Sequence, residues 1–185
     1  MKKGFYSMKT KKINSLLNYL KNKGYELNFN DLHIINDYTL EVNGCKYYIL
    51  TPLERDEVFY KEVSLKWSRV GLSECSSSLV DRILDECLDT KKLEYLGDNE
   101  LVEYDEETRS YFPLGTSWGY DNPIKYLYHD VDVNEVTKII NEYELLDMNK
   151  LCKLILSCEG YSTTLATFDH EEIPLGEYYG YFIGF

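Results

Sequence analysis

The stretch YTLEVNGCKYYILTPLE, residues 38–54, decides the local fold of this chain. Two runs rich in β-branched and aromatic residues, 38–42 and 45–50, flank the dipeptide Asn43-Gly44. Asparagine and glycine tolerate the positive φ angles that a two-residue type I′ turn requires at both central positions. The sequence therefore predicts an antiparallel β-hairpin with its turn at this dipeptide.

A helix is predicted directly after this hairpin, from residue 52 to about residue 70. Thr51 can cap its start, Pro52 fits the first helical position, and Glu54 can return the hydrogen bond of a capping box. Gly71 provides a natural end. One side of this helix is apolar, through residues at helical spacing: Val58, Phe59, Val63, Trp67 and Val70.

The remaining elements are predicted from the spacing of apolar residues, which differs between helices and strands. Apolar residues recur at helical spacing in four further segments, 10–23, 79–89, 133–144 and 148–158. Period-two alternation predicts a third strand at 25–29 beside the hairpin, and a closing hairpin formed by 162–168 and 177–185. The predicted fold class is α+β, with about five helices and a small antiparallel sheet or sheets built from hairpins. The pattern does not decide whether the two hairpins share one sheet.

Charge is distributed unevenly along this chain, whose formal net charge is −12. The first 25 residues carry seven lysines and no acidic residue, whereas residues 94–185 hold 19 acidic against five basic residues. We expect residues 1–24 to form a basic amphipathic helix and residues 25–185 a single acidic α+β domain. An anionic surface repels nucleic acid and attracts basic protein grooves, so the expected partner is a basic nucleic-acid-binding protein. The N-terminal lysines either bind nucleic acid directly or pair with the acidic body.

An acidic segment in the middle of the chain is the predicted interaction site. If residues 100–105 form a strand, Glu103 and Asp105 lie about 7 Å apart on one face, within a Debye length of about 8 Å at physiological salt. Their charges then act together. The Gly- and Pro-rich stretch 113–123 adds aromatic residues on an irregular loop. The predicted partner-binding residues are Glu100, Glu103, Asp105, Glu106 and Glu107, with Trp118 and Tyr120 as aromatic anchors.

The sequence shows no recognisable catalytic motif. It has three histidines, and neither a phosphate-cradling glycine loop nor a dinucleotide fingerprint. Five cysteines at irregular spacing, in a chain without an export signal, indicate reduced cytoplasmic thiols and neither a zinc site nor a disulfide framework. We therefore expect no enzymatic activity, no cofactor, no metal and, without a transmembrane stretch, no membrane partner. The alternative is a thiol enzyme with Cys75, near a helix start, as its nucleophile.

Two segments resemble a loosely defined group of small uncharacterised proteins from phages and mobile elements of Gram-positive bacteria. Residues 49–67 are similar to that group's helix start, LT-x-x-E-A-D-E followed by a tryptophan, with Arg55 where the group has alanine. Residues 165–181 are similar to its closing hairpin, L-A-x-Y-D-G-x-E and then Y-Y-I-Y, with His170 where the group has glycine. The resemblance implies a phage or mobile-element protein in a bacterial host cell, a setting in which small acidic proteins often inhibit host defence.

Three hypotheses of function follow. The first is a stoichiometric inhibitor of the anti-CRISPR or antirestriction type, which presents an acidic, nucleic-acid-mimicking surface to a host nuclease complex. The second is an immunity protein or antitoxin that neutralises a basic toxin. The third is a small cysteine-dependent enzyme. Stoichiometry separates the third from the others, because an inhibitor saturates at equal amounts of its target whereas a catalyst acts far below that ratio.

Overall fold

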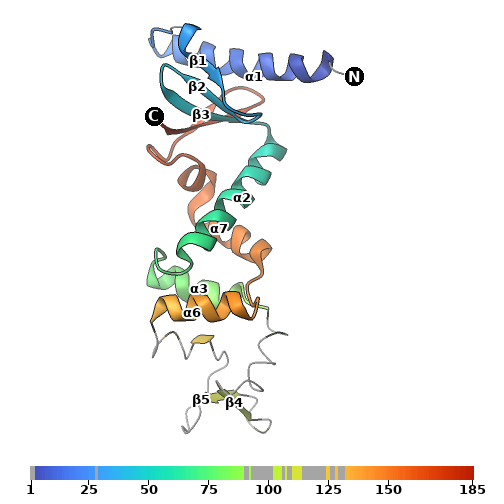
Figure 1. Ribbon diagram of the computed structural model, residues 1–185, viewed down its shortest axis with the longest axis vertical. Coiled ribbons are helices and arrows are strands. Elements are labelled where there is room, and N and C mark those ends of the chain that lie inside the picture. The colour runs from blue at the N-terminus through green and yellow to red at the C-terminus, as the bar shows by residue number, and fades with distance from the viewer. Residues whose placement is uncertain are drawn as a thin grey trace. The chain divides into compact units, whose positions relative to one another are not determined.

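The computed structural model describes residues 3–27, 29–89, 92, 102–105, 107, 110–113, 124–125, 128 and 132–185. The described part of the chain has an α+β fold, which confirms the predicted class (Figure 1). The chain divides into two compact units. The sheet unit is Met1–Val63 with Cys158–Phe185, and the central unit is Ser64–Ser157. The boundaries expected for an N-terminal helix and a single following domain stay a prediction.

The sheet unit contains α1 (Lys3–Asn22), a short 3-10 helix η1 (Phe29–Asp31) and five strands. The strands are β1 (Leu32–Ile34), β2 (Thr39–Val42), β3 (Cys45–Leu50), β6 (Glu172–Pro174) and β7 (Tyr179–Gly184). Their order in the sheet is β1-β2-β3-β7-β6, and every neighbouring pair is antiparallel. Because β3 pairs with β7, the N-terminal and closing hairpins belong to one sheet.

The predicted hairpin turn and capping box are both confirmed. Asn43 and Gly44 have φ angles of 51° and 77°, the positive values that a type I′ turn requires. The backbone N–H of Thr51 donates to Glu54 Oε2 at 2.8 Å, and the N–H of Glu54 donates to Thr51 Oγ1 at 3.3 Å. Helix α2 (Pro52–Val70) begins at this reciprocal pair of bonds.

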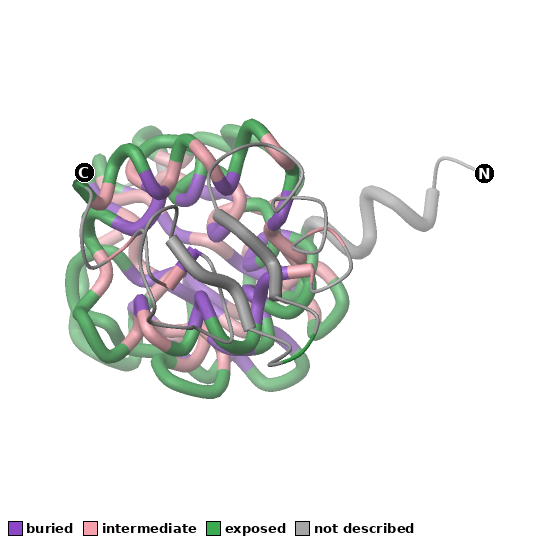
Figure 2. The backbone as a smooth tube through the Cα atoms, turned by 90° about the horizontal axis from the view of Figure 1, so that it is seen from below, coloured by how far each residue is buried: buried purple, intermediate pink, exposed green. Residues whose placement is uncertain are grey.

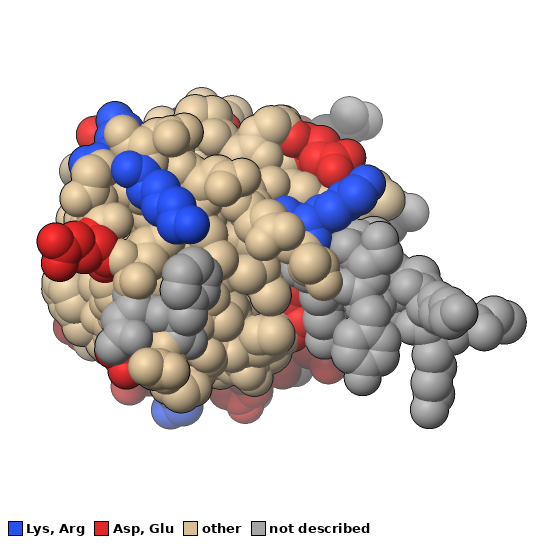
Figure 3. All heavy atoms as spheres, turned by 90° about the horizontal axis from the view of Figure 1, so that it is seen from above, with Lys and Arg blue, Asp and Glu red and all other residues tan. Residues whose placement is uncertain are grey.

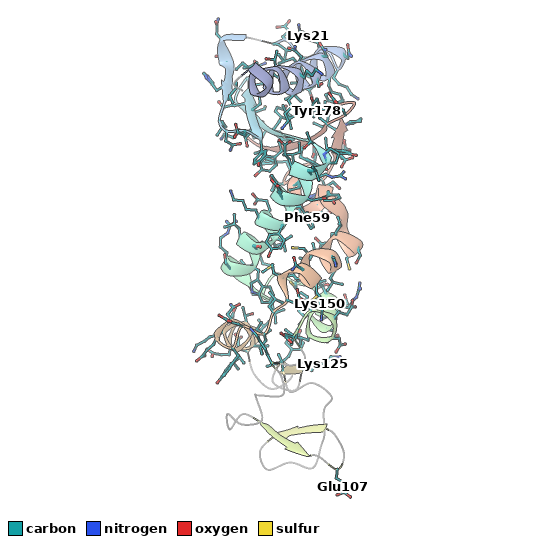
Figure 4. All side chains as sticks on the ribbon, turned by 90° about the vertical axis from the view of Figure 1, so that its right-hand side faces the viewer. Lys21, Phe59, Glu107, Lys125, Lys150 and Tyr178 are labelled. Carbon is teal, nitrogen blue, oxygen red and sulfur yellow. The ribbon has the colours of Figure 1, made fainter. Side chains whose placement is uncertain are left out.

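Helix α1 packs against one face of the sheet. Its apolar stripe is Leu16, Leu17 and Leu20, and all three side chains are buried. They meet alternate residues of β2 and β3, and Tyr178 from the turn before β7 (Figure 4). The first turn of α1 has no acidic residue to favour its N-terminus, so burial of the stripe is the main stabilising contribution to this helix.

The central unit contains α3 (Ser77–Glu86), β4 (Val102–Asp105), β5 (Ser110–Pro113) and α6 (Val133–Glu142), with parts of α2 and α7 (Met148–Leu165). Ser76 and Asp132 cap α3 and α6 by accepting backbone N–H groups. Trp67 Nε1 donates to Asn141 Oδ1 at 2.9 Å and links α2 to α6 within this unit. Each of these helices buries one stripe of side chains and exposes the other (Figure 2).

The strand predicted at 25–29 is wrong. Residues 25–27 have no regular structure and residues 29–31 form η1, so the third strand of the hairpin is β1. The alternation of tyrosine, leucine and phenylalanine at 25–29 has a different cause: Leu27 packs against the core between α1 and the sheet, whereas Tyr25 is 60% exposed.

The first strand of the predicted closing hairpin is also wrong, because residues 162–165 are helical and belong to the part of α7 that follows a kink at Gly160 (φ 74°). The observed closing hairpin pairs β6 with β7. Leu165 and Ala166 are buried almost completely, and the N–H of Ala166 donates to the carbonyl of Ser162 in the helical pattern. Burial of these apolar side chains therefore outweighs the β-propensity of the neighbouring threonines.

An ion pair joins α1 to the start of α2. Lys12 Nζ lies 2.5 Å from Glu54 Oε2, and the two side chains are only 7% and 20% exposed. The same oxygen accepts the N–H of Thr51, so one carboxylate both caps α2 and neutralises an ammonium group. Burial acts to raise the pKa of Glu54, but the hydrogen bonds from Lys12 and Thr51 outweigh it, and the pKa lies below its ordinary value. One N-terminal lysine therefore pairs with the acidic body.

Replacing Lys12 tests this pair. Lys12→Met keeps the length of the side chain but removes its charge, and it should lower the free energy of unfolding at pH 7 by about 2 kcal/mol in urea titrations. Lys11→Met, the exposed neighbour, should change it by less than about 0.5 kcal/mol. Because folding lowers the pKa of Glu54, the contribution is present above about pH 4.3, the unfolded value, and is lost as the pH falls through the lower folded value. A Lys12→Met effect that persists unchanged below both values contradicts the pair.

A second prediction concerns Gly71, which ends α2 with a φ angle of 53°. A Cβ atom at this position would lie 2.1 Å from Thr137 Cγ2 of α6, so a side chain meets both a left-handed backbone and a steric overlap. Gly71→Ala should lower the free energy of unfolding by about 3 kcal/mol. Gly176 has a φ angle of 77° and open space where a Cβ would lie, so Gly176→Ala measures the backbone cost alone. This substitution should lower the free energy of unfolding by only about 1 kcal/mol. Equal effects of the two substitutions would show that the Thr137 side chain moves aside without a cost in stability.

Candidate functional site

The predicted partner-binding residues with described positions lie on and beside β4. Glu103 and Asp105 are two residues apart on this strand, opposite Phe112 and Ser110 of β5. Glu107 is an exposed residue of the turn that follows (Figure 4). The structure thus brings three of the predicted acidic residues onto one hairpin. Four predicted residues lie outside the described part of the chain: Glu100, Glu106, Trp118 and Tyr120.

Most of the negative charge belongs to the central unit. Ser64–Ser157 has 19 acidic and 10 basic residues, a net charge of −9, whereas the sheet unit has a net charge of −3. On the face drawn in Figure 3, acidic and basic side chains of the described residues are interspersed among uncharged ones. Four cations of the central unit form ion pairs within it: Arg82 with Glu86, Lys92 with Glu144, Lys125 with Asp85, and Lys138 with Glu135. A surplus of carboxylates therefore remains that the cations of this unit do not offset.

A second group of polar side chains lies between the sheet and the N-terminal half of α2, on the face opposite α1. Alternation along β3 and β7 directs Tyr48 and Tyr181, which are register partners, to this face. Four tyrosine hydroxyls in this region each donate a hydrogen bond to a carboxylate. These tyrosine–carboxylate pairs are Tyr38 with Glu57 (3.4 Å), Tyr48 with Glu62 (3.0 Å), Tyr161 with Asp56, and Tyr181 with Glu172.

Arg55 lies at the centre of this face, within what we term the arginine clamp. Its guanidinium carbon is 4.0 Å from the ring centroid of Tyr161 and 3.8 Å from that of Tyr179. Its Nη1 lies 3.3 Å from Glu172 Oε2, the oxygen that also accepts the Tyr181 hydroxyl. Its Nε is buried without a hydrogen-bond partner in the described structure. The clamp therefore holds a guanidinium group mainly through two aromatic faces and one carboxylate.

The tyrosines of these pairs are proton donors, not bases. Burial, followed by the charge of Glu62, raises the pKa of Tyr48 to about 12. Burial and then the hydrogen bond to Glu172 raise the pKa of Tyr181 far above its ordinary value, although Arg55 acts in the opposite direction. Burial is also the largest cause of the raised pKa values of Tyr38 and Tyr161. All four hydroxyls therefore stay protonated at neutral pH, which suits recognition and not base catalysis.

A hollow of about 210 Å³ opens beside two of the pairs. We call it the acidic hollow. It is lined by Asn36, Tyr38 and Tyr48 on the sheet side, and by Glu57, Val58, Lys61 and Glu62 on α2. The backbone beside Tyr38 is held by Asn36, another lining residue, whose Oδ1 accepts the backbone N–H groups of residues 38 and 39. The hollow therefore has a fixed aromatic wall and a wall of two carboxylates.

Sequence reasoning did not identify this polar face. Two contacts of this face join residues far apart in the chain: Tyr161 and Asp56 are 105 positions apart, and Arg55 and Glu172 are 117 positions apart. One signal was present: Tyr179 and Tyr181 are two positions apart in one strand, and the register places Tyr48 of the neighbouring strand opposite Tyr181. That signal has no meaning until the pairing of β3 with β7 is known.

The thiol alternative rests on Cys75, which precedes the cap of α3 and whose Sγ donates to the carbonyl of Gly71 at 3.8 Å. Burial raises the pKa of Cys87 to about 11 and also raises that of Cys152, so these two buried thiols are poor nucleophiles at neutral pH. Of the histidines, His33 and His170 are exposed, and His129 lies outside the described residues. The structure leaves a role for Cys75 as a prediction.

No protein-family model, curated protein or solved structure matches this chain. The similarity to phage and mobile-element proteins therefore stays a prediction. Across the described residues, no group of three or more His, Cys, Asp or Glu side chains is arranged to hold a metal ion. Each of the described helices is too short or too polar to cross a lipid bilayer.

The arginine clamp predicts that Arg55→Lys is not a conservative change. A lysine cannot stack on two tyrosine rings as a planar guanidinium does, so the free energy of unfolding should fall by about 1–2 kcal/mol. Arg69→Lys makes the same chemical change at an exposed position of α2 and should alter it by less than about 0.5 kcal/mol. Urea unfolding followed by circular dichroism measures both variants. Equal stability of Arg55→Lys and the wild-type protein would show that the two ring contacts contribute nothing.

Proposed function

We propose that this protein is a stoichiometric, non-enzymatic inhibitor of the anti-CRISPR or antirestriction type. Its carboxylates occupy a basic, nucleic-acid-binding channel of a host nuclease complex in a bacterial cell. The observation that carries the proposal is the charge of the central unit, a net −9 that includes the acidic residues of the β4–β5 hairpin.

The physical basis is substitution of one anion for another. Nuclease channels bind the phosphates of nucleic acid with lysine and arginine, and much of that affinity is electrostatic. Carboxylates carried on a folded protein compete for the same cations, and unlike-charged surfaces steer the encounter. Glu103 and Asp105 lie two residues apart on β4, so the hairpin fixes the backbone spacing of these two acidic residues. Binding of this kind weakens as salt is added.

The chemistry of the described side chains favours binding over catalysis. The tyrosine hydroxyls of the sheet unit stay protonated at neutral pH, and the buried thiols of the central unit have raised pKa values. These groups are suited to hydrogen bonding and packing. Four of the ten cations of the central unit pair with acids of the same unit, and its 19 acidic residues outnumber its cations, which favours attraction of a basic partner.

Charge reversal tests the proposal. The triple substitution Glu103→Lys, Asp105→Lys and Glu107→Lys should abolish inhibition, because it replaces attraction to a basic channel by repulsion. The control triple, Glu26→Lys, Glu159→Lys and Glu171→Lys, makes the same change in net charge at exposed positions outside the central unit. The measurement is the plating efficiency of a phage on cells that carry a CRISPR or restriction system and express each variant.

Circular dichroism and thermal unfolding of the purified proteins check that both triples fold. The expected result is loss of protection with the first triple and retention with the second. Full protection by the first triple, or equal loss with both, contradicts the placement of the binding site. With purified nuclease, inhibition should saturate at equal amounts of inhibitor and nuclease complex, and inhibition at far lower amounts contradicts a stoichiometric mode.

A further inference from the structure

The acidic hollow of the sheet unit is lined by acidic and aromatic residues, and this composition favours a cationic ligand. Two acidic residues, Glu57 and Glu62, and two tyrosines, Tyr38 and Tyr48, line it together. Each carboxylate uses one oxygen to accept a tyrosine hydroxyl, Glu57 Oε2 from Tyr38 and Glu62 Oε1 from Tyr48. The second oxygen of each has no hydrogen-bond partner in the described structure. Carboxylate acceptors and tyrosine side chains are the groups with which proteins bind an organic cation.

The size of the hollow restricts this cation further. Its volume of about 210 Å³ is below the roughly 300–1,000 Å³ of pockets that enclose drug-sized ligands. A volume of this size matches a single side chain better than a drug-sized ligand. The hollow opens on the surface, beside the exposed residues Glu57 and Lys61.

The molecule itself shows how such a site holds a guanidinium group. In the arginine clamp, Arg55 stacks between Tyr161 and Tyr179 and contacts Glu172, whose carboxylate also accepts a tyrosine hydroxyl. The acidic hollow repeats these parts on the same face of the same sheet: two tyrosine rings, and carboxylates that accept tyrosine hydroxyls. It has one more carboxylate than the clamp, and so one more acceptor for the planar donors of an arginine.

We propose that the acidic hollow binds an arginine side chain of the partner protein. The guanidinium group stacks on Tyr38 and Tyr48 and donates to the second oxygens of Glu57 and Glu62. The inference rests on the proposed function in taking the partner to be a basic protein, but it assigns a second contact, in the sheet unit, separate from the acidic hairpin of the central unit.

Lys61 provides a test of whether the hollow binds a cation or an anion. Its side chain lines the hollow and forms no ion pair with Glu57 or Glu62 within 4.0 Å in the described structure. A positive charge at this position opposes a cationic guest. Lys61→Met should therefore tighten binding of an arginine peptide, whereas an anion-binding hollow would be weakened by the same change.

The experiment is a titration of the full chain, labelled on its tyrosine rings with 13C, with the peptide Gly-Arg-Gly. We expect saturable shifts of the Tyr38 and Tyr48 ring signals, assigned with Tyr38→Phe and Tyr48→Phe, and a dissociation constant on the order of millimolar for one side chain. Gly-Lys-Gly should bind more weakly, because an ammonium group cannot stack or donate as a planar fork. The uncharged citrulline peptide should give no saturable shift.

The double substitution Glu57→Gln with Glu62→Gln keeps acceptors for the tyrosine hydroxyls and should weaken Gly-Arg-Gly binding about tenfold. Glu159→Gln with Glu171→Gln changes the net charge equally and should leave it unchanged. The inference is overturned by absence of saturable shifts, by equal binding of the lysine or citrulline peptide, by equal effects of the two double substitutions, or by weaker binding to Lys61→Met. Because no nuclease is present, failure here and failure of the plating assay are independent results.

Discussion

The buried contact between Lys12 and Glu54 is the constraint on which the sheet unit depends. Glu54 Oε2 receives both the ammonium group of α1 and the N–H of Thr51, so one oxygen fixes the helix above the sheet and the first turn of the helix below it. Helix α2 starts directly after β3 ends, so the position of its first turn determines where the acidic residues of its N-terminal half lie. Three of the four tyrosine–carboxylate pairs, the arginine clamp and the acidic hollow use residues of α2 within ten positions of Glu54.

The two faces of the sheet have different chemistry because side chains alternate along each strand. One face meets the leucine stripe of α1 and is apolar. The other meets α2 and the end of α7, and there tyrosines satisfy their hydroxyls with carboxylates. Tyrosine serves both purposes, since its ring packs like an apolar residue while its hydroxyl needs a partner. The high tyrosine content of the chain is explained in part by this face, which combines burial with fixed hydrogen-bond acceptors.

Local signals predicted well where they were strong. Asn43-Gly44, the capping box at Thr51, and the stripes of α2, α3 and α6 depend on near neighbours in the chain, and all are present. The strand expected at 162–168 failed because burial of Leu165 and Ala166 within the fold outweighed local β-propensity. The acidic hollow was harder to predict from the sequence than the strands and helices. Acidic density along the sequence pointed to β4, whereas the acidic hollow requires β2, β3 and α2 to be in place before its walls face each other.

The order of strands in the sheet has a consequence for biosynthesis. β3 lies between β2 and β7, and Lys46 donates to the carbonyl of a residue 139 positions later in the chain. On the ribosome, one side of β3 therefore has no partner until the whole of the central unit has been translated, and unpaired strand edges invite association with other chains. The central unit is continuous in sequence and can form its contacts first. Maturation of the sheet unit is thus limited by the arrival of β7, and slower translation of the closing segment prolongs the interval in which a nascent chain needs protection by chaperones.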